Sequence, residues 1–376
     1  FLQEDIADKT IKMLKGAMLE LRVGSPDRLA TDIGPVIDAE AQRNLLAHIE
    51  RTKATARSHF ALALPTSITS CGTFVPPTVL EIASLSELKQ EVFGPVLHIV
   101  RYRRADLPKV IASINATGFG LTLGVHSRID ETIDYIVNHA HVGNIYVNRN
   151  IVGAVVGVQP FGGEGKSGTG PKAGGPLYIK RLQRGAAPLM DHVRQADVAL
   201  EALIGWLRTN GQQPVVALAE GYARTSLNGV AIDLPGPTGE RNRLSFTPRG
   251  VVLCASGTPA GLLNQVAAAL ATGNRALVLT MSPEAIPANL PQAVKERVRF
   301  IGKDEVDAGE FAIALVESGL AGSLRTQLAA RSGAIVGVVD TEPLAAVDLW
   351  RLVAERAVCV NTTAAGGNAS LMTLGL

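Results

Sequence analysis

The chain opens with two stretches in which apolar residues recur at helical spacing. Residues 5–21 place an apolar side chain every three or four positions, with lysines on the opposite face. This spacing predicts an amphipathic helix that Gly24 ends. Asp38 is placed to cap a second helix, whose inner face includes Leu45 and Ile49.

The following segments continue the alternation of helix and strand. No regular pattern holds over residues 51–70, which we expect to form a surface excursion. Ser84 and Glu87 form a capping box ahead of a helical turn that leads to Glu91. Such alternation is typical of a parallel α/β sheet with covered faces. Further helices are predicted over residues 106–116 and 130–140, the second capped by Asp130, and strands over residues 121–126 and 144–147.

The second half of the chain repeats this alternation after a different start. A helix is predicted over residues 192–207, and a strand-rich region with many turns over residues 215–246. We therefore expect two domains, residues 1–185 and residues 186–376, the second of them doubly wound. Its predicted elements are strands over residues 251–255, 276–280, 311–316, 335–339 and 357–360, and a helix over residues 262–271 that Gly273 ends.

Seven glycines lie among the sixteen residues from Phe161 to Pro176, directly after a strand-like run. Such a density marks turns with positive φ, or main chain that approaches a ligand closely, although a loop-rich connection has the same composition. Gly163, Gly165 and Gly168 match the pattern G-x-G-x-x-G of dinucleotide-binding proteins. That pattern must open a helix, and Pro171 with the glycines after it prevents one, so we reject the match.

Composition narrows the class of protein. Of the 376 residues, 47% are hydrophobic and 19% charged, with a formal net charge of +2, which is typical of a soluble globular protein and gives no field suited to nucleic acid. No apolar run is long enough to span a bilayer, and the N-terminus has no signal-peptide pattern. Cys71, Cys254 and Cys359 lie far apart, which favours reduced thiols in a cytoplasmic compartment. Neither cysteines nor histidines show metal-ligand spacing, so we expect no metal site.

The order of residues in two segments carries a family resemblance. Residues 143–182, which contain the run QPFGGEGKSGTGPKAGGP, resemble the aldehyde dehydrogenase superfamily, and so do residues 91–96, EVFGPV. In particular they resemble the L-glutamate-γ-semialdehyde dehydrogenase module of the bifunctional proline utilization A flavoproteins. The resemblance implies an α/β fold in which residues 1–185 form the second half of an aldehyde-dehydrogenase fold, with a parallel-sheet catalytic lobe and an oligomerisation flap.

The second half resembles another part of the same superfamily. Residues 247–279 resemble the first strand-helix-strand unit of its cofactor domain, which implies a degenerate Rossmann-like domain in residues 186–376. The superfamily ends the second strand with a lysine for the adenosine ribose, whereas this chain has Thr280 and Met281, so the resemblance does not extend to cofactor binding there. Residues 360–373 resemble the closing motif of the proline utilization A family, a tail that helps to seal a passage between two active sites; a frayed terminus is the alternative.

The resemblance assigns roles to five residues. Glu91 would accept hydrogen bonds from both hydroxyls of the nicotinamide ribose, and Phe93 would form an apolar wall beside the nicotinamide ring. The amides of Gly174 and Gly175 would hold the α-carboxylate of the substrate, and Phe161 would line the site. Alternatively, Glu91 only ends a helix and Phe93 belongs to the core.

No catalytic residue is expected within this chain. The resemblance places the nucleophilic cysteine upstream of Phe1, together with the general base and the phosphate-binding loop of the cofactor. The three cysteines present are better explained as buried or incidental thiols. Lys166, Lys172 and Arg149 fit solvated surface positions equally well.

The resemblance implies part of an NAD-dependent enzyme that oxidises L-glutamate-γ-semialdehyde to L-glutamate in proline catabolism, with the isolated fragment inactive. FAD would belong to an upstream proline dehydrogenase domain of the same polypeptide. The resemblance also implies a cytoplasmic homo-oligomer without nucleic acid contact from this portion, and leaves open a peripheral membrane association of the longer parent. Two alternatives remain: a non-catalytic assembly or lid module, and a dehydrogenase of another aldehyde, which Gly174-Gly175-Pro176 disfavours.

Overall fold

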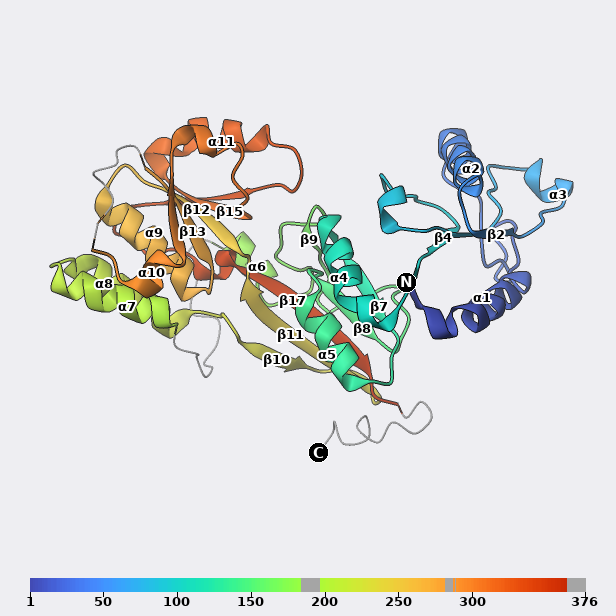
Figure 1. The fold of residues 1–376 in the computed structure, drawn as a ribbon, viewed down its shortest axis with the longest axis horizontal. Helices are drawn as coiled ribbons and strands as arrows, with labels where there is room; N and C mark the ends of the chain where they lie inside the picture. Colours follow the sequence, from blue (N-terminus) through green and yellow to red (C-terminus); the bar gives the residue numbers. More distant parts are fainter. Residues whose placement is uncertain (184–196, 281–286, 288, 364–376) are drawn as a thin grey trace. The chain divides into compact units, whose positions relative to one another are not determined.

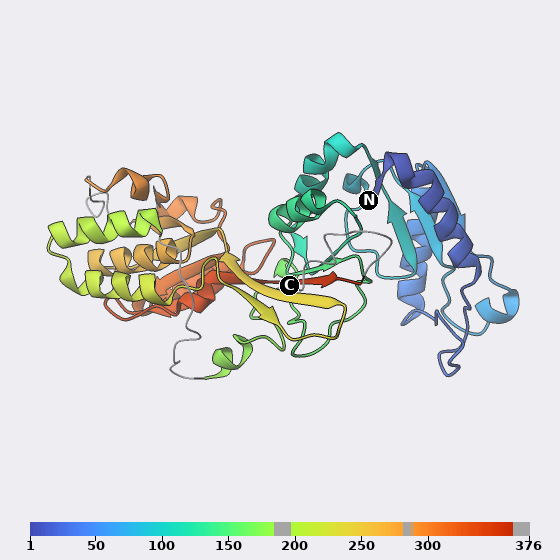
Figure 2. The same cartoon turned by 90° about the horizontal axis from the view of Figure 1, so that it is seen from below.

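The protein forms two compact units, residues 1–116 and residues 117–376. Helices flank β-sheets in each of them (Figures 1 and 2). The structure is a computed structural model that describes residues 1–183, 197–280, 287 and 289–363.

The first unit is built on the three-stranded sheet β2-β3-β4, with helices α1 and α2 on either side of it (Figure 1). Ile11 of α1 packs on Val79 of the sheet, as the helical spacing predicts. Asp38 accepts a main-chain hydrogen bond at the start of α2, and Leu45 and Ile49 are buried, so this prediction is confirmed. The elements are β1 (Leu2–Gln3), α1 (Glu4–Leu19), α2 (Ala39–Lys53), β2 (Ser58–Ala61), α3 (Thr66–Thr69), β3 (Thr78–Glu81), η1 (Leu85–Glu87), β4 (Val96–Ile99), β5 (Arg101–Tyr102), η2 (Arg104–Asp106) and α4 (Leu107–Ala116).

Residues 51–70 are more regular than we expected. They contain the edge strand β2, which pairs antiparallel with β3 and places His59 opposite Leu80. A four-residue strand at a sheet edge is too short to show a period of two, which explains why the pattern gave no signal.

The second unit contains two five-stranded sheets. Its elements are β6 (Phe119–Gly120), β7 (Thr122–Val125), α5 (Asp130–His139), β8 (Asn144–Val147), β9 (Glu164–Gly165), α6 (Tyr178–Leu182), α7 (Val198–Thr209), α8 (Gln213–Thr225), β10 (Ala231–Leu234), β11 (Glu240–Pro248), β12 (Val251–Ala255), α9 (Pro259–Ala271), β13 (Arg275–Leu279), α10 (Gln292–Lys295), β14 (Val298–Ile301), η4 (Lys303–Glu305), β15 (Ile313–Glu317), η5 (Ser318–Leu320), α11 (Ala321–Ala329), β16 (Gly337–Thr341), η6 (Leu349–Leu352) and β17 (Val353–Asn361).

The first of these sheets has the order β10-β11-β17-β8-β7 and joins distant parts of the sequence (Figure 1). Strand β17 runs parallel to β8, with Ala357 opposite Asn144, and antiparallel to β11. All residues of β8 are buried, so its main-chain groups need a neighbouring strand on each side. We expected residues 357–360 to continue the second α/β series, and this was wrong, because β17 fills the open side of β8 instead.

The second sheet is parallel and has the order β14-β13-β12-β15-β16. Helices α7, α8 and α9 pack on one face, and α11 packs on the other. The order reverses at β12, as in doubly wound nucleotide-binding folds. The prediction of an α/β fold with parallel sheets is therefore confirmed.

Two local predictions in the second unit were wrong. The region 215–246 begins with helix α8, not with strands, because Val215, Ala219 and Tyr222 recur at helical spacing and are buried on one face. Asp130 does not cap α5; the cap position is Ile129, and Asp130 is the first helical residue.

The domain boundary proposed between residues 185 and 186 lies outside the described residues and stays a prediction. The resemblance of residues 360–373 to a closing motif also falls mostly outside them. Within the described ranges, none of the helices combines the length and apolarity needed to cross a membrane.

The contact between Gly94 and helix α2 can be tested by substitution. A Cβ added at Gly94 would lie 2.5 Å from Leu45 Cδ1, and Leu45 is buried, so we expect Gly94→Ala to lower the free energy of unfolding by about 1–3 kcal/mol. Gly16→Ala is the matched control, because no atom lies within 4 Å of its added Cβ and the change should raise stability by about 0.5–1 kcal/mol. Urea denaturation of the chain measures both, and an unchanged stability of Gly94→Ala would contradict this packing.

Candidate functional site

Glu91 and Phe93 lie on the loop between η1 and β4. The loop begins at the predicted capping box, in which Glu87 Oε1 accepts the Ser84 N–H at 3.1 Å. Val92 packs in the apolar cluster beneath α2, while Glu91 on one side of it is exposed and Phe93 on the other is 85% exposed. Phe93 is therefore no core residue of this chain. An exposed aromatic ring beside an exposed carboxylate fits a ligand with a flat ring and hydroxyl groups.

The glycine-rich segment folds back on itself in the second unit. Phe161 and Ala173 exchange both main-chain hydrogen bonds, at 3.0 and 2.9 Å. The Gly175 N–H donates to Lys172 O at 3.1 Å and closes a turn in which Gly174 is the third residue, with a φ of +69°. A type II turn needs positive φ at that position, which glycine adopts without strain. Gly174 is exposed, and its N–H donates no hydrogen bond to any residue that the structure describes.

Lys172 anchors this hairpin through both its side chain and its main chain. Its ammonium group donates to Asn144 Oδ1 at 2.8 Å and to Gly162 O. Its main-chain N–H donates to Glu355 Oε2 at 2.7 Å. The sequence left a solvated position open for Lys172, and the structure excludes it: the residue is 2% exposed, because strands β8 and β17 cover it.

Burial dominates the electrostatics of Lys172 and Glu355. It lowers the pKa of Lys172 to about 8, although the negative charges of Glu355 and Glu164 oppose this shift. Burial also raises the pKa of Glu355, against the hydrogen bond from the Lys172 N–H and the positive charges of Lys172 and Arg249. The pKa values of both groups shift in the direction that favours the neutral form. The electrostatic attraction between the two groups is therefore smaller than the free-energy cost of removing their charges from water. The pair is better explained by the geometry that it fixes than by ion-pair energy.

A second polar cluster includes Gln159, which lies just before the glycine-rich segment in the sequence. Arg149 Nη1 lies 2.5 Å from Glu240 Oε1 and donates to Cys359 Sγ at 3.0 Å. Gln159 Nε2 donates to the same sulfur at 3.3 Å. The Arg149 side chain is only 16% exposed, so of the two alternatives left open by the sequence the solvated one is excluded here too.

The three cysteines are free thiols. Cys71 is exposed, whereas Cys254 and Cys359 are buried, as we predicted for thiols without a catalytic role. Burial strongly raises the pKa of Cys254, and it raises that of Cys359 although Arg149 opposes it. A raised pKa keeps a thiol protonated and poorly nucleophilic.

The rejection of the G-x-G-x-x-G match is confirmed. Gly165 belongs to the short strand β9, which pairs with β6, and the next helix along the described chain is α6, more than ten residues later. The described residues also contain no group of three or more His, Cys, Asp or Glu placed to hold a metal ion.

The doubly wound sheet has its switch point between β12 and β15, where such sheets commonly bind phosphates. Here the carboxylate of Glu317 occupies that position, accepting the Gly257 N–H at 2.9 Å and the Ser256 hydroxyl. Thr258 caps α9 and accepts the Gly261 N–H at 3.1 Å. The donors that would receive a phosphate are thus used by the chain's own side chains, which argues against nucleotide binding at this crevice.

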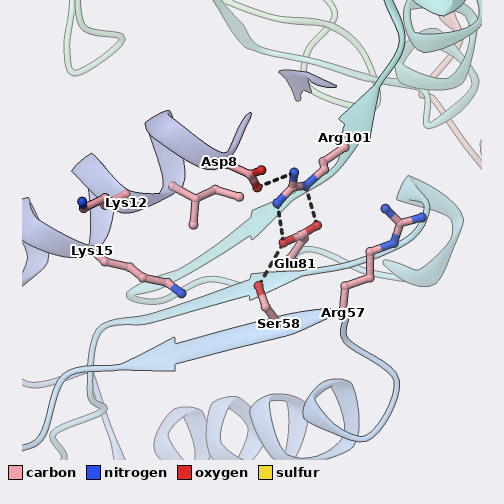
Figure 3. A pocket seen from close by; sticks show the side chains of 8 residues that line it. Asp8, Lys12, Lys15, Arg57, Ser58, Glu81 and Arg101 are labelled. Carbon is pink, nitrogen blue, oxygen red and sulfur yellow. Dashed lines mark hydrogen bonds and ion pairs between the residues drawn. The ribbon is translucent and has the colours of Figure 1, made fainter. Parts of the chain in front are cut away.

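The first unit also has a hollow of about 530 Å³, formed by α1, β2, β3 and β5. Figure 3 shows Arg101 between Asp8 and Glu81, with Nε 2.7 Å from Glu81 Oε1 and Nη1 2.7 Å from Asp8 Oδ1. Burial alone would raise the pKa of Glu81, but the hydrogen bonds from Arg101 and Ser58 lower it overall. The other charged residues of the lining are Lys12, Lys15 and Arg57. The hollow is separate from the loop of Glu91, and its centre is an ion pair that ties α1 to the sheet.

The predicted site residues thus lie in two places. Glu91 and Phe93 share one loop of the first unit, and the structure brings Phe161, Gly174 and Gly175 together in one hairpin of the second unit. The amide of Gly175 already closes the turn, so that of Gly174 is the donor left for a ligand. The roles of all five remain predictions.

Sequence reasoning missed Glu355 and Asn144 and left the position of Lys172 open. A period of two along β17 would have indicated Glu355, because Val353, Glu355, Ala357 and Cys359 alternate with the residues of the opposite face. A glutamate among such buried neighbours needs a partner in the interior. Nothing in the sequence indicated that the partner would be Lys172.

Comparison with known proteins agrees with this architecture. Residues 1–184 match the model of the aldehyde dehydrogenase family. The chain is 47% identical over 400 residues to the bifunctional protein PutA of Salmonella typhimurium, with 100% of this chain and 30% of that protein covered. It is 38% identical over 178 residues to the 1-pyrroline-5-carboxylate dehydrogenase of Geobacillus thermodenitrificans, covering 47% of this chain and 34% of that protein.

A solved structure supports the fold over nearly the full length. Proline Utilization A from Corynebacterium freiburgense superposes with a TM-score of 0.66 and 23% identity, covering 93% of this chain and 34% of that one. The chain thus spans about a third of the length of the curated relatives that it matches. Residues 1–184 belong to the aldehyde dehydrogenase family, within a chain that is similar throughout to the C-terminal part of the bifunctional PutA proteins.

Proposed function

We propose that the full-length protein oxidises L-glutamate-γ-semialdehyde, derived from 1-pyrroline-5-carboxylate, to L-glutamate with NAD in proline catabolism. The observation that carries this proposal is the turn at Gly174, which presents an exposed main-chain amide without a partner among the described residues. The turn lies within residues 1–184, which match the model of the aldehyde dehydrogenase family, and about half of the chain is similar to a 1-pyrroline-5-carboxylate dehydrogenase. An amide directed at a carboxylate suits a substrate that is both an aldehyde and an amino acid.

The substrate's carboxylate would bind at the Gly174 amide by a charge-assisted hydrogen bond. Phe161 would lie beside the aliphatic part of the substrate, since its main chain pairs with Ala173 next to the turn. The ammonium group of Lys172 is buried behind the hairpin and would add a favourable positive charge. An aldehyde without a carboxylate gains neither the hydrogen bond at Gly174 nor the attraction to Lys172, which would give the site its selectivity.

The loop with Glu91 and Phe93 would orient the cofactor. Its exposed carboxylate suits the two hydroxyls of a ribose, and its exposed ring suits one face of nicotinamide. NAD, when bound, supplies the two-electron oxidant. The aldehyde dehydrogenase family uses NAD or NADP, and we propose NAD for this protein.

The remaining parts of the activity would lie upstream of Phe1. We propose that the nucleophilic cysteine precedes this chain, that an upstream proline dehydrogenase domain carries FAD, and that the protein is cytoplasmic. We also propose that the protein forms a homo-oligomer. Val152 and Val156 support this last point, because these apolar side chains are 83% and 86% exposed in the single chain.

A second function, as a non-catalytic assembly module, fits residues 186–376. The carboxylate of Glu317 takes the donors at the switch point of the doubly wound sheet. A domain of this kind would contribute contacts and strand pairing to the enzyme instead of binding its own cofactor.

The role of Glu91 predicts a specific defect in cofactor use. In the full-length protein we expect Glu91→Ala to raise the KM for NAD about tenfold, because a charge-assisted contact to the ribose is lost. Glu50→Ala, which removes an exposed carboxylate elsewhere in the same unit, is the control and should leave this KM unchanged. Steady-state kinetics at saturating aldehyde measures both, and normal NAD kinetics in Glu91→Ala would defeat the assignment.

The turn at Gly174 predicts a defect in substrate use. An alanine at a φ of +69° costs about 1–2 kcal/mol, so we expect Gly174→Ala to turn the amide away and raise the KM for L-glutamate-γ-semialdehyde. Gly211→Ala carries the same backbone strain at a φ of +70° with no atom near the added Cβ, and should leave the KM unchanged. A panel of aldehydes in which the wild-type protein prefers another substrate would instead support the alternative dehydrogenase.

The use of the switch-point donors by Glu317 predicts that residues 186–376 contribute no cofactor site. We expect isothermal titration of this chain with NAD to give no heat of tight binding, because the ribose-binding loop alone holds only one part of the cofactor. Glu317→Ala should free the Gly257 amide, and the same titration is therefore repeated with this variant. Tight binding of NAD that Glu317→Ala strengthens would show that the crevice is a cofactor site after all.

A further inference from the structure

A carboxylate from near the end of the described chain lies buried against the glycine-rich hairpin. Glu355 is 7% exposed and lies on the face of β17 that also carries Ala357 and Cys359. Its Oε2 atom accepts the Lys172 N–H at 2.7 Å. Its Oε1 atom is buried and has no hydrogen-bond partner among the described residues. Buried carboxylates with an unsatisfied oxygen are costly, so this one calls for an explanation.

Glu355 contacts the turn at both of its ends. Lys172, which donates to it, is the first residue of the turn, and Gly175 is the last. A Cβ added at Gly175 would lie 3.1 Å from Glu355 Oε1, so the carboxylate packs closely against this residue. The two residues between these contacts, Ala173 and Gly174, are exposed.

The direction of the Gly174 N–H depends on how the ends of the turn are held. This N–H belongs to the middle peptide of the turn, and turns of type I and type II differ in the orientation of that peptide. The φ of +69° at Gly174 corresponds to type II. Asn144 and Gly162 fix the side chain of Lys172, whereas Glu355 is the one acceptor of its main-chain N–H among the residues that the structure describes.

We propose that Glu355 is a positioning residue for substrate selectivity: by holding the Lys172 N–H it sets the orientation of the Gly174 amide that binds the substrate carboxylate. The proposal rests on the function proposed above for this turn. It assigns a residue of the second half of the chain to the selectivity of a site built by the first half.

The test compares two substrates in the full-length protein at saturating NAD. We expect Glu355→Ala to raise the KM for L-glutamate-γ-semialdehyde about tenfold, with kcat changed less than about twofold and the kinetics with propanal unchanged. Propanal has no carboxylate, so a loss of folded enzyme would lower the rates with both substrates equally. Glu355→Met keeps most of the volume without the acceptor, and serves if the alanine variant does not fold.

Two further variants sharpen the result. Glu355→Gln keeps an oxygen that can accept the Lys172 N–H, so it should restore a KM close to that of the wild-type protein. Asp197→Asn removes another partly buried carboxylate, which lies 2.7 Å from Arg297 Nη1 and away from the hairpin, and should leave both substrates unaffected.

The outcomes separate the two proposals. A wild-type protein without preference for the semialdehyde over propanal would overturn the proposed function and this inference with it. A wild-type preference that survives in Glu355→Ala and Glu355→Met would overturn the inference alone. An equal loss with both substrates in these variants would also overturn it, since it would assign Glu355 a purely structural role.

Discussion

The pairing of β17 with β8 is the constraint on which the glycine-rich hairpin depends. Strand β8 is buried throughout and pairs with β7 on one side, so β17 supplies the hydrogen bonds that its other side requires. The same strand carries Glu355 to Lys172 and Cys359 to Gln159. The hairpin therefore takes its shape from a strand that follows it by well over a hundred residues.

The glycines of the hairpin serve different physical needs. Gly174 needs its positive φ, whereas Gly175 is limited by space, because a Cβ there would crowd Glu355 Oε1. Outside the hairpin, Gly143 is limited in the same way by the main-chain oxygen of Gly162. The sequence shows only that backbone approaches something closely. In this chain much of what it approaches is the chain itself, whereas the exposed amide of Gly174 donates to no residue that the structure describes.

How far the sequence predicts the structure depends on the range of each interaction. The helix over residues 5–21, the cap at Asp38 and the box at Ser84 rest on neighbours a few positions apart, and all three are present. The partner of β8 and the burial of Lys172 depend on a strand far along the chain, which no local pattern reveals. Glu91 could be located from its motif, but its exposure follows from Val92, which packs under α2.

Two carboxylates of the second unit illustrate opposite uses of the same chemistry. Glu317 accepts the Gly257 amide and the Ser256 hydroxyl directly, and so consumes donors at the switch point where a phosphate would bind. Glu355 instead accepts the Lys172 amide at the edge of the turn and leaves the neighbouring Gly174 amide free. An acceptor that takes the amide of Lys172, two residues before Gly174, therefore leaves the Gly174 amide available, whereas an acceptor at the switch point occupies the donor there. This difference explains how one unit can combine a closed crevice with an open, oriented amide.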